Sequence, residues 1–293
     1  MRIYGDQKTG YLASKIYVLY FEEELTEGFL KSGGTMKTQK RILLLAVTLT
    51  CALFAQGPWA KKDWKQWSKD ECKRVMEDSP WAVSYTDSKA QTSVLAGSDS
   101  SGTRTDSRIE TSYIVQLRSA LPIRQAFARQ VLIQYKFDSV DETKKQDLLK
   151  QVQPIVDKIY DDVIVVHVIY GSNIQQYQNE MMVFWQTKYP PGTVPQDAFL
   201  NTTSAKKVLP IKFISPKGGA PEFELIFPRT VDGKPVIGAD DKLMSIEFVT
   251  PRVGNTATAS RGNISDTSGG ASGRRAYAEF KVEKMMMDGK LVY

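Results

Sequence analysis

The chain has 293 residues, with 39 Lys or Arg and 33 Asp or Glu, and a formal net charge of +6 at pH 7. Positive and negative side chains are interspersed, whereas nucleic-acid binding requires Lys and Arg clustered on one face. The whole chain has one His and two Cys, too few for a zinc site built from several such ligands. We therefore expect no nucleic-acid partner, no metal site and no cofactor.

Residues 36–57 have the layout of a secretory signal peptide: three basic residues, an apolar run over residues 42–54, and small residues after it. The apolar run is shorter than the ~20 residues that span a bilayer. We predict a signal peptide over residues 36–55, cleaved after Ala55. The protein would then be exported to the periplasm or the extracellular space, with the membrane involved through the signal alone.

Two details of this segment leave alternatives open. Residues 1–35 precede the signal, which is explained by a mis-called start with Met36 as the true first residue, or by a cytoplasmic tail ahead of a membrane anchor. Cleavage after Gly57 is a second possibility, although Pro58 would follow the bond. Cys51 suggests a lipoprotein, but residues 48–50, Thr-Leu-Thr, are a poor lipidation motif.

Residues 56–107 are predicted to form a small capped helix and a polar linker. Ser68 and Glu71 have the spacing of a capping box, with Trp67 and Cys72 as a hydrophobic staple, so a helix is expected over residues 69–78. We interpret the tryptophans around it as anchors onto the core; a docking surface is the alternative. Residues 86–107 are rich in Ser, Thr, Gly and Asp, which predicts a loop or linker.

The next segment mixes helices with one central strand. Residues 109–117 alternate as a half-buried strand does, and residues 163–170, Val-Ile-Val-Val-His-Val-Ile-Tyr, are apolar on both faces, as in a covered central strand. Helices are expected from residues 119–122 to about 135, over residues 140–160 after a second capping box at Ser139 with a kink at Pro154, and after a cap at Asn173.

The remainder alternates with a period of two residues, which is typical of an antiparallel sheet. We expect strands over residues 208–215, 223–227, 243–249 and 276–284, then a hairpin between residues 285–287 and 291–293 around Asp288-Gly289. Residues 254–274 are predicted to be a mobile polar loop. The fold class is therefore α+β, with a helix-rich first half, a central apolar strand and a mostly antiparallel sheet, and residues 108–293 form its globular domain.

His167 is the one side chain with an unperturbed pKa near neutrality, so a nucleophile–His pair would have to use it. It lies in the middle of the apolar strand, whereas catalytic groups usually project from loops or strand ends. We interpret His167 as a neutral, hydrogen-bonded core residue.

Three other groups of residues are candidate sites. Residues 171–173, Gly-Ser-Asn, could bind an anion at a helix start, but a turn with an Asn cap explains them as well. Asp161 and Asp162 are adjacent at a strand start, so their side chains diverge. Met285 to Met287 could attract Cu(I), but consecutive strand residues cannot all face one ion. We therefore assign no catalytic or metal residue from the sequence.

Three stretches carry a resemblance: WKQWSKDECKRVMEDSPW, SALPIRQAFARQ and FPRTVDGKPV. They are similar to exported bacterial proteins that are functionally uncharacterised. The resemblance implies one exported unit and supplies no activity, site or partner.

We expect an exported binding or scaffold module, with an envelope or extracellular partner, rather than an enzyme. The alternative is a hydrolase whose site uses carboxylates brought together from distant positions, since two Asp or Glu side chains suffice for some hydrolyses. Facing carboxylates in a pocket would favour the hydrolase, and a wide exposed aromatic patch would favour the binder.

Overall fold

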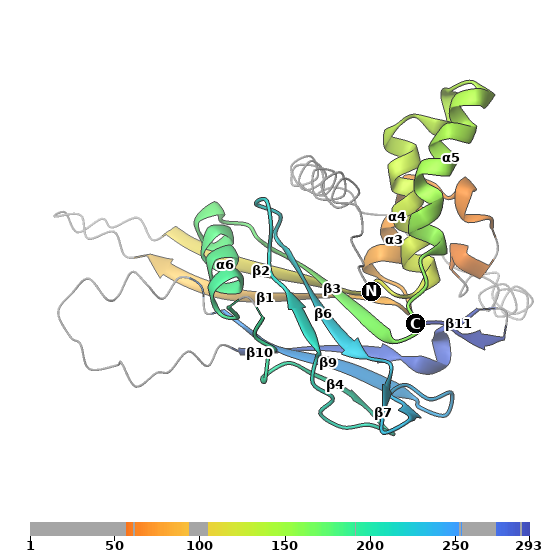
Figure 1. Ribbon diagram of the computed structural model, residues 1–293. Coiled ribbons are helices and arrows are strands. Elements are labelled where there is room, and N and C mark those ends of the chain that lie inside the picture. Colours follow the sequence, from red (N-terminus) through yellow and green to blue (C-terminus); the bar gives the residue numbers. More distant parts are fainter. Residues whose placement is uncertain are drawn as a thin grey trace, which may run out of the picture.

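The structure is a computed structural model and describes residues 57–60, 62–93, 105–190, 192–251, 253, 274–287 and 289–293. The predicted signal segment, the upstream extension and Cys51 lie outside these residues, as do residues 254–273 of the predicted mobile loop. Four α-helices and several antiparallel sheets make up the described part, so the predicted α+β class is confirmed (Figure 1). None of the helices in these ranges is long and apolar enough to cross a membrane.

A five-stranded antiparallel sheet forms the centre of the molecule, in the order β1-β2-β3-β6-β5. Its strands are β1 (Ala82–Ser93), β2 (Thr105–Leu117), β3 (Val163–Ser172), β5 (Lys212–Ile214) and β6 (Glu222–Pro228). The predicted central strand is the middle strand, and residues 164–171 of β3 are all buried. A strand covered on both faces reads as a continuous apolar run, which is why the sequence indicated its position.

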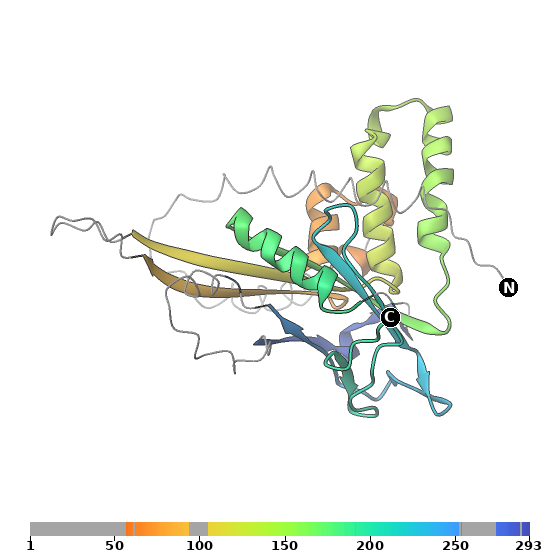
Figure 2. The ribbon, with the colours of Figure 1, turned by 60° about the vertical axis from the view of Figure 1, so that its left-hand side comes forward.

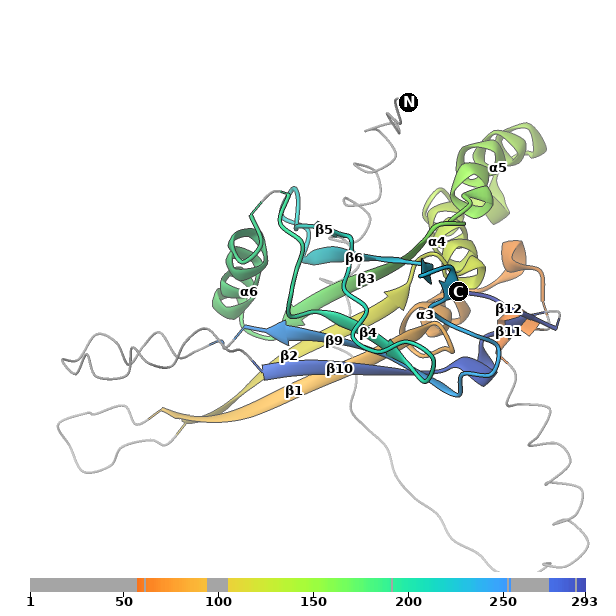
Figure 3. The same cartoon turned by 60° about the horizontal axis from the view of Figure 1, so that its bottom comes forward.

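A smaller sheet with the order β10-β9-β4 lies beside the first (Figure 3). It consists of β4 (Phe199–Thr202), β9 (Leu243–Thr250) and β10 (Arg274–Lys281). Strand β4 was not predicted, and the strand expected over residues 276–284 gives way to a 3-10 turn, η5 (Val282–Lys284). The strand expected over residues 208–215 is reduced to β5.

Two short hairpins complete the β structure. The predicted C-terminal hairpin is confirmed as β11 (Met286–Met287) and β12 (Lys290–Leu291). A second hairpin joins β7 (Thr230–Val231) to β8 (Lys234–Pro235). Its turn has positive φ at Asp232 and Gly233, which fits the Asp-Gly preference of tight hairpins.

The helices stand at opposite ends of the large sheet (Figures 1 and 2). One end carries α3 (Lys69–Glu77), α4 (Leu121–Gln134) and α5 (Glu142–Asp157), and the other carries α6 (Gln175–Thr187). Three short 3-10 turns lie in the helical end: η1 (Pro58–Ala60), η2 (Trp64–Gln66) and η3 (Phe137–Ser139). The helix α5 includes Pro154 and ends at Asp157.

The two predicted capping boxes have different outcomes. At α3 the first is confirmed, because Ser68 accepts a bond from the Glu71 amide and the Glu71 carboxylate accepts one from the Ser68 amide. The second is wrong: the cap of α5 is Asp141, which accepts a bond from the Lys144 amide at 2.9 Å. Ser139 belongs to η3 and its hydroxyl bonds the Lys136 carbonyl, so it is unable to cap α5.

The polar linker predicted over residues 86–107 is also wrong where the structure describes it. Residues 86–93 belong to β1 and residues 105–107 to β2, and the two strands pair from Ala82↔Gln116 to Ser93↔Thr105. Strand β3 pairs with β2 from Thr111 onward, so residues 105–110 pair with residues 88–93 of β1 but not with β3. We call this paired segment the ribbon. The polar composition of the ribbon gave no sign of a strand, because backbone pairing and not an apolar face stabilises it.

One large core joins the two sheets to α3 and α6. Its centre is aromatic, with Trp185 of α6 packed 4.1 Å from Phe223 of β6 and 6.0 Å from Phe248 of β9, between ring centroids. Trp67 and Cys72, on either side of the Ser68 cap, are buried in the same core. A second, smaller core lies between α4 and α5 and contains Leu132 and Val152.

Candidate functional site

His167 lies in the middle of β3, directly opposite Gln116 of β2 and Glu224 of β6. Alternate residues of a strand point to opposite faces. The large core contains residues 164, 166, 168 and 170 of β3, so His167 points to the other face of the sheet. The period-two pattern of β6 places Glu222 and Glu224 on this face as well, because Phe223, Leu225 and Phe227 are in the core.

The imidazole of His167 lies between two carboxylates. Its Nε2 atom is 3.2 Å from Oε2 of Glu222, which is an ion-pair distance. Its Nδ1 atom is 3.5 Å from Oε1 of Glu224. Arg118, directly after β2, completes the group: its Nη1 atom lies 3.1 Å from the same Glu224 oxygen and 3.3 Å from His167 Nδ1. We call these four residues the charged cluster.

Burial and charge act in opposite directions on the pKa of His167. Burial alone would lower it, but the contacts with Glu222 and Glu224 outweigh burial and the repulsion from Arg118, and the pKa rises above its ordinary value. Burial would likewise raise the pKa of Glu224, yet His167, Arg118 and Lys158 together lower it to about 2. The pKa of Glu222 is lowered by His167 and Arg118 against the same effect of burial.

The charged cluster is balanced when His167 is protonated, because two cations then face two carboxylates. The imidazole is almost fully buried, with 2% of its side chain exposed, whereas 29% of Arg118, 20% of Glu222 and 21% of Glu224 is exposed. The aromatic ring of Phe127 on α4 lies 5.4 Å from the Arg118 guanidinium and holds it against the sheet. Chemically, the cluster is an ion-pair network with a titratable group at its centre.

The prediction that His167 is buried in the sheet among apolar neighbours is confirmed. The carboxylates raise its pKa above the ordinary value, which shifts the balance toward the protonated form. The predicted neutral state stays a prediction. Sequence reasoning missed Arg118, Glu222 and Glu224 as its partners. The alternation Glu-Phe-Glu-Leu-Ile-Phe in β6 places both carboxylates on one face. The pairing of β6 with β3, however, is a tertiary contact that the local sequence does not indicate.

The Gly-Ser-Asn segment at residues 171–173 does not cap a helix. Gly171 and Ser172 end β3, and Ile174 occupies the N-cap of α6 without a side-chain bond. Asn173 instead binds the neighbouring strand: its Oδ1 accepts a bond from the Glu110 amide at 2.9 Å, and its own amide donates to the Glu110 carbonyl at 3.2 Å. The Asn cap is therefore a wrong prediction, and this residue fixes β2 at the base of the ribbon.

The other sequence candidates are not brought together into a site. Asp161 and Asp162 are both exposed, before β3. Met285 is fully buried while Met286 is 42% exposed, so the methionines point in different directions. Within the residues that the structure describes, no three His, Cys, Asp or Glu side chains gather closely enough to hold a metal ion.

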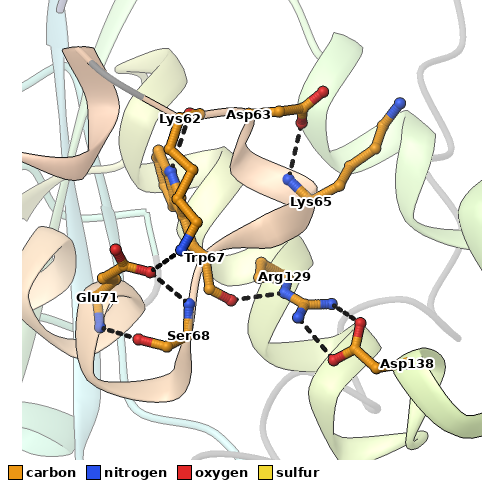
Figure 4. Close-up of polar contacts among 8 residues, drawn as sticks. All are labelled: Lys62, Asp63, Lys65, Trp67, Ser68, Glu71, Arg129 and Asp138. Atoms are coloured by element: carbon orange, nitrogen blue, oxygen red, sulfur yellow. Dashed lines mark hydrogen bonds and ion pairs between the residues drawn. The ribbon is translucent and has the colours of Figure 1, made fainter.

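The tryptophans near α3 anchor it, as interpreted from the sequence. Trp67 and Trp81 are buried, and Trp67 donates to the Lys62 carbonyl at 3.2 Å (Figure 4). The Trp67 carbonyl in turn accepts a 2.7 Å bond from Nε of Arg129 on α4. The Arg129 guanidinium also pairs with both carboxylate oxygens of Asp138, at 3.2 and 2.8 Å. This network joins α3 to α4. Trp67 and Trp81 are therefore buried anchors, and Trp64 is partly buried against both cores.

The thiol of Cys72 is the one free cysteine in the described ranges, and it is buried. Burial raises its pKa to about 12. A nucleophilic cysteine requires the thiolate at neutral pH, so Cys72 is a packing residue.

No family model matches the chain, and no curated protein and no solved structure matches it. The resemblance to exported bacterial proteins therefore stays a prediction.

Proposed function

We propose that the protein is an exported binding or scaffold module that holds its partner through the ribbon formed by β1 and β2. The signal-like residues 36–55 support export, and their predicted cleavage would leave every described residue in the mature chain. Native protein purified from the envelope or the culture medium should begin at Gln56 in N-terminal sequencing. A native chain that began before Met36 would contradict this part of the proposal.

The observation that carries the binding function is the projection of the ribbon. The β1–β2 hairpin extends past the ends of the other strands in all three views of the ribbon diagram (Figures 1, 2 and 3). The bonds between Asn173 and Glu110 fix its base. From there to Thr105, strand β2 pairs with β1 and not with β3.

A two-stranded ribbon is marginally stable by itself in water, and each of its outer edges presents backbone N–H and C=O groups. An added strand from a partner would bond these groups and extend the sheet, which is a common way to bind an extended peptide. Apart from Ile109 at its base and Ala90, the residues of the ribbon are polar, so backbone pairing is the main interaction it can offer. We therefore expect a partner that contributes an extended segment.

The hydrolase alternative has one observation in its favour, the two carboxylates beside His167. Their pKa values are both lowered, so neither carboxyl is the protonated acid that a carboxylate pair needs near neutral pH. With His167 protonated, the two carboxylates are balanced by His167 and Arg118 within the charged cluster. This arrangement favours a structural network over a catalytic site.

Two hairpin variants separate the ribbon from residues 94–104, which follow β1 in the sequence. In the ribbon-shortened variant, Asn-Gly replaces residues 90–108 and closes the hairpin between the paired residues Lys89 and Ile109. In the loop-shortened control, Asn-Gly replaces residues 94–104 between the paired residues Ser93 and Thr105. Asn-Gly suits both positions because it favours the tight turn of two-residue hairpins.

Each bait is immobilised through an N-terminal tag before Gln56, because Tyr293 at the other end is buried. Envelope extracts are passed over wild type and both variants, and captured proteins are compared by mass spectrometry. We expect a set of proteins that wild type and the loop-shortened control retain and the ribbon-shortened variant loses. Equal capture by all three baits would contradict a role of the ribbon in binding.

A further inference from the structure

The charged cluster connects three neighbouring strands through one histidine. His167 belongs to β3, Glu222 and Glu224 to β6, and Arg118 follows β2. Among the residues that the structure describes, the strand beyond β6 in this sheet is the short edge strand β5, which pairs with β6 over Lys212–Ile214. The contacts of His167 therefore lie at the junction between the centre of the sheet and its β6–β5 edge.

We propose that His167 is a proton-operated clasp between β3 and β6: its protonated imidazole holds Glu222 and Glu224, and loss of the proton loosens the β6–β5 edge. The geometry supports this because an oxygen of each carboxylate lies next to a different ring nitrogen, at 3.2 and 3.5 Å. A neutral imidazole has one N–H donor, so it can satisfy one carboxylate, whereas the imidazolium has two.

The charged groups that face the imidazole act on its protonation in both directions. Glu222 and Glu224 approach from β6 and favour it, while Arg118 opposes it from the end of β2. Lys158, which follows α5, lowers the pKa of Glu224. The side-chain amide of Gln116, opposite His167, donates to the Met76 carbonyl at 2.7 Å. When the imidazole loses its proton, two poorly solvated carboxylates share Arg118, and the cluster carries an uncompensated negative charge.

The sign of the pH dependence follows from the raised pKa of His167. A group whose pKa is higher in the folded state stabilises that state fully below the unfolded pKa of about 6.5, and the stabilisation is lost as pH rises through the folded pKa. The clasp is therefore closed in mildly acidic solution and opens as the solution becomes alkaline.

The single histidine makes the proton directly observable. In protein labelled with ¹³C-histidine, the one imidazole signal should titrate above the ordinary His pKa of about 6.5. Glu222→Gln and Glu224→Gln should each lower this value. The matched control is Glu247→Gln on β9, because Glu247 has a similarly half-buried carboxylate, 27% exposed, in the other sheet, and it should leave the titration unchanged.

Hydrogen exchange then tests the mechanical part. After correction for intrinsic exchange, the opening constants of the β5 and β6 amides should rise between pH 5.5 and pH 8.5, and those of β9 and β10 should not. Each unit by which the folded pKa exceeds the unfolded pKa corresponds to a roughly tenfold rise. A wild-type histidine that titrates at or below 6.5, or β5–β6 amides whose opening is independent of pH, would overturn the clasp; neither measurement depends on a variant that folds.

Discussion

The two faces of strand β3 are both buried, but different interactions stabilise them. Toward the large core, Ile164, Val166 and Val168 pack against the aromatic centre. On the opposite face, His167 is equally buried but forms ion pairs with Glu222 and Glu224. Apolar packing is non-directional and tolerates a change of pH, whereas the charged cluster depends on the protonation of each member. One strand therefore has a permanent face and a conditional face.

The largest effect is expected on the permanent face. Phe223→Ala removes a buried ring that lies 4.1 Å from Trp185 and 5.8 Å from Phe248, between centroids. The cavity and lost transfer energy should lower the free energy of unfolding by about 3–5 kcal/mol at any pH between 5.5 and 8.5. Denaturant unfolding measures this loss, with Val183→Ala on α6 as the control, because Val183 is 54% exposed. A loss of stability that changed strongly with pH would contradict the prediction that this face is independent of pH.

A smaller, conditional effect is expected from His167. His167→Ala leaves Glu222 and Glu224 with an uncompensated charge and should cost about 1–3 kcal/mol at pH 6. His167→Gln keeps one amide donor and should cost less. Thermal unfolding of both variants at pH 6 gives the order, and whatever partner wild type binds should still be bound below the melting temperature. Unchanged melting together with a lost activity would instead make His167 a catalytic residue.

The smallest effect on stability is expected from the ribbon. The ribbon-shortened variant keeps Ile109, which is buried in the large core, and removes a segment paired with one neighbouring strand. Its free energy of unfolding should stay within about 0.5 kcal/mol of wild type, as for surface changes in general. Denaturant unfolding of the ribbon-shortened variant and of the loop-shortened control measures this difference in free energy. A loss of several kcal/mol would mean that the ribbon belongs to the core and is not a free binding element.

The permanent face was predictable from the sequence, and the conditional face was not. Continuous apolarity over residues 163–170 identified the central strand, and alternation at Phe223, Leu225 and Phe227 identified β6 with its core side. Both features are local. The charged cluster joins residues from positions 118, 167, 222 and 224, and its existence depends on the order β2-β3-β6, which no local pattern specifies.

The errors at residues 86–93, at residues 105–107 and at Asn173 have the same origin. A polar segment without an apolar face was interpreted as a linker, although its strands bond each other. Asn173 was assigned the local role of a cap, although it bonds Glu110, which is distant in the sequence. In both cases a backbone partner from elsewhere in the chain decided the structure. Local chemistry at Ser68 and Glu71, by contrast, predicted the capping box of α3 correctly.

The most direct test of the conditional face is the pH dependence of stability in wild type and His167→Gln. No other histidine exists in the chain. Because burial raises the pKa of Cys72 in the folded state, ionisation of this thiol in the unfolded chain, at about pH 8.5, would add its own loss of stability. The free energy of unfolding of each protein is therefore measured by denaturant between pH 5.5 and pH 7.5. The account predicts that wild type loses stability as pH rises and that His167→Gln shows a flat profile. A wild-type profile that is flat, or one that rises with pH, would contradict it.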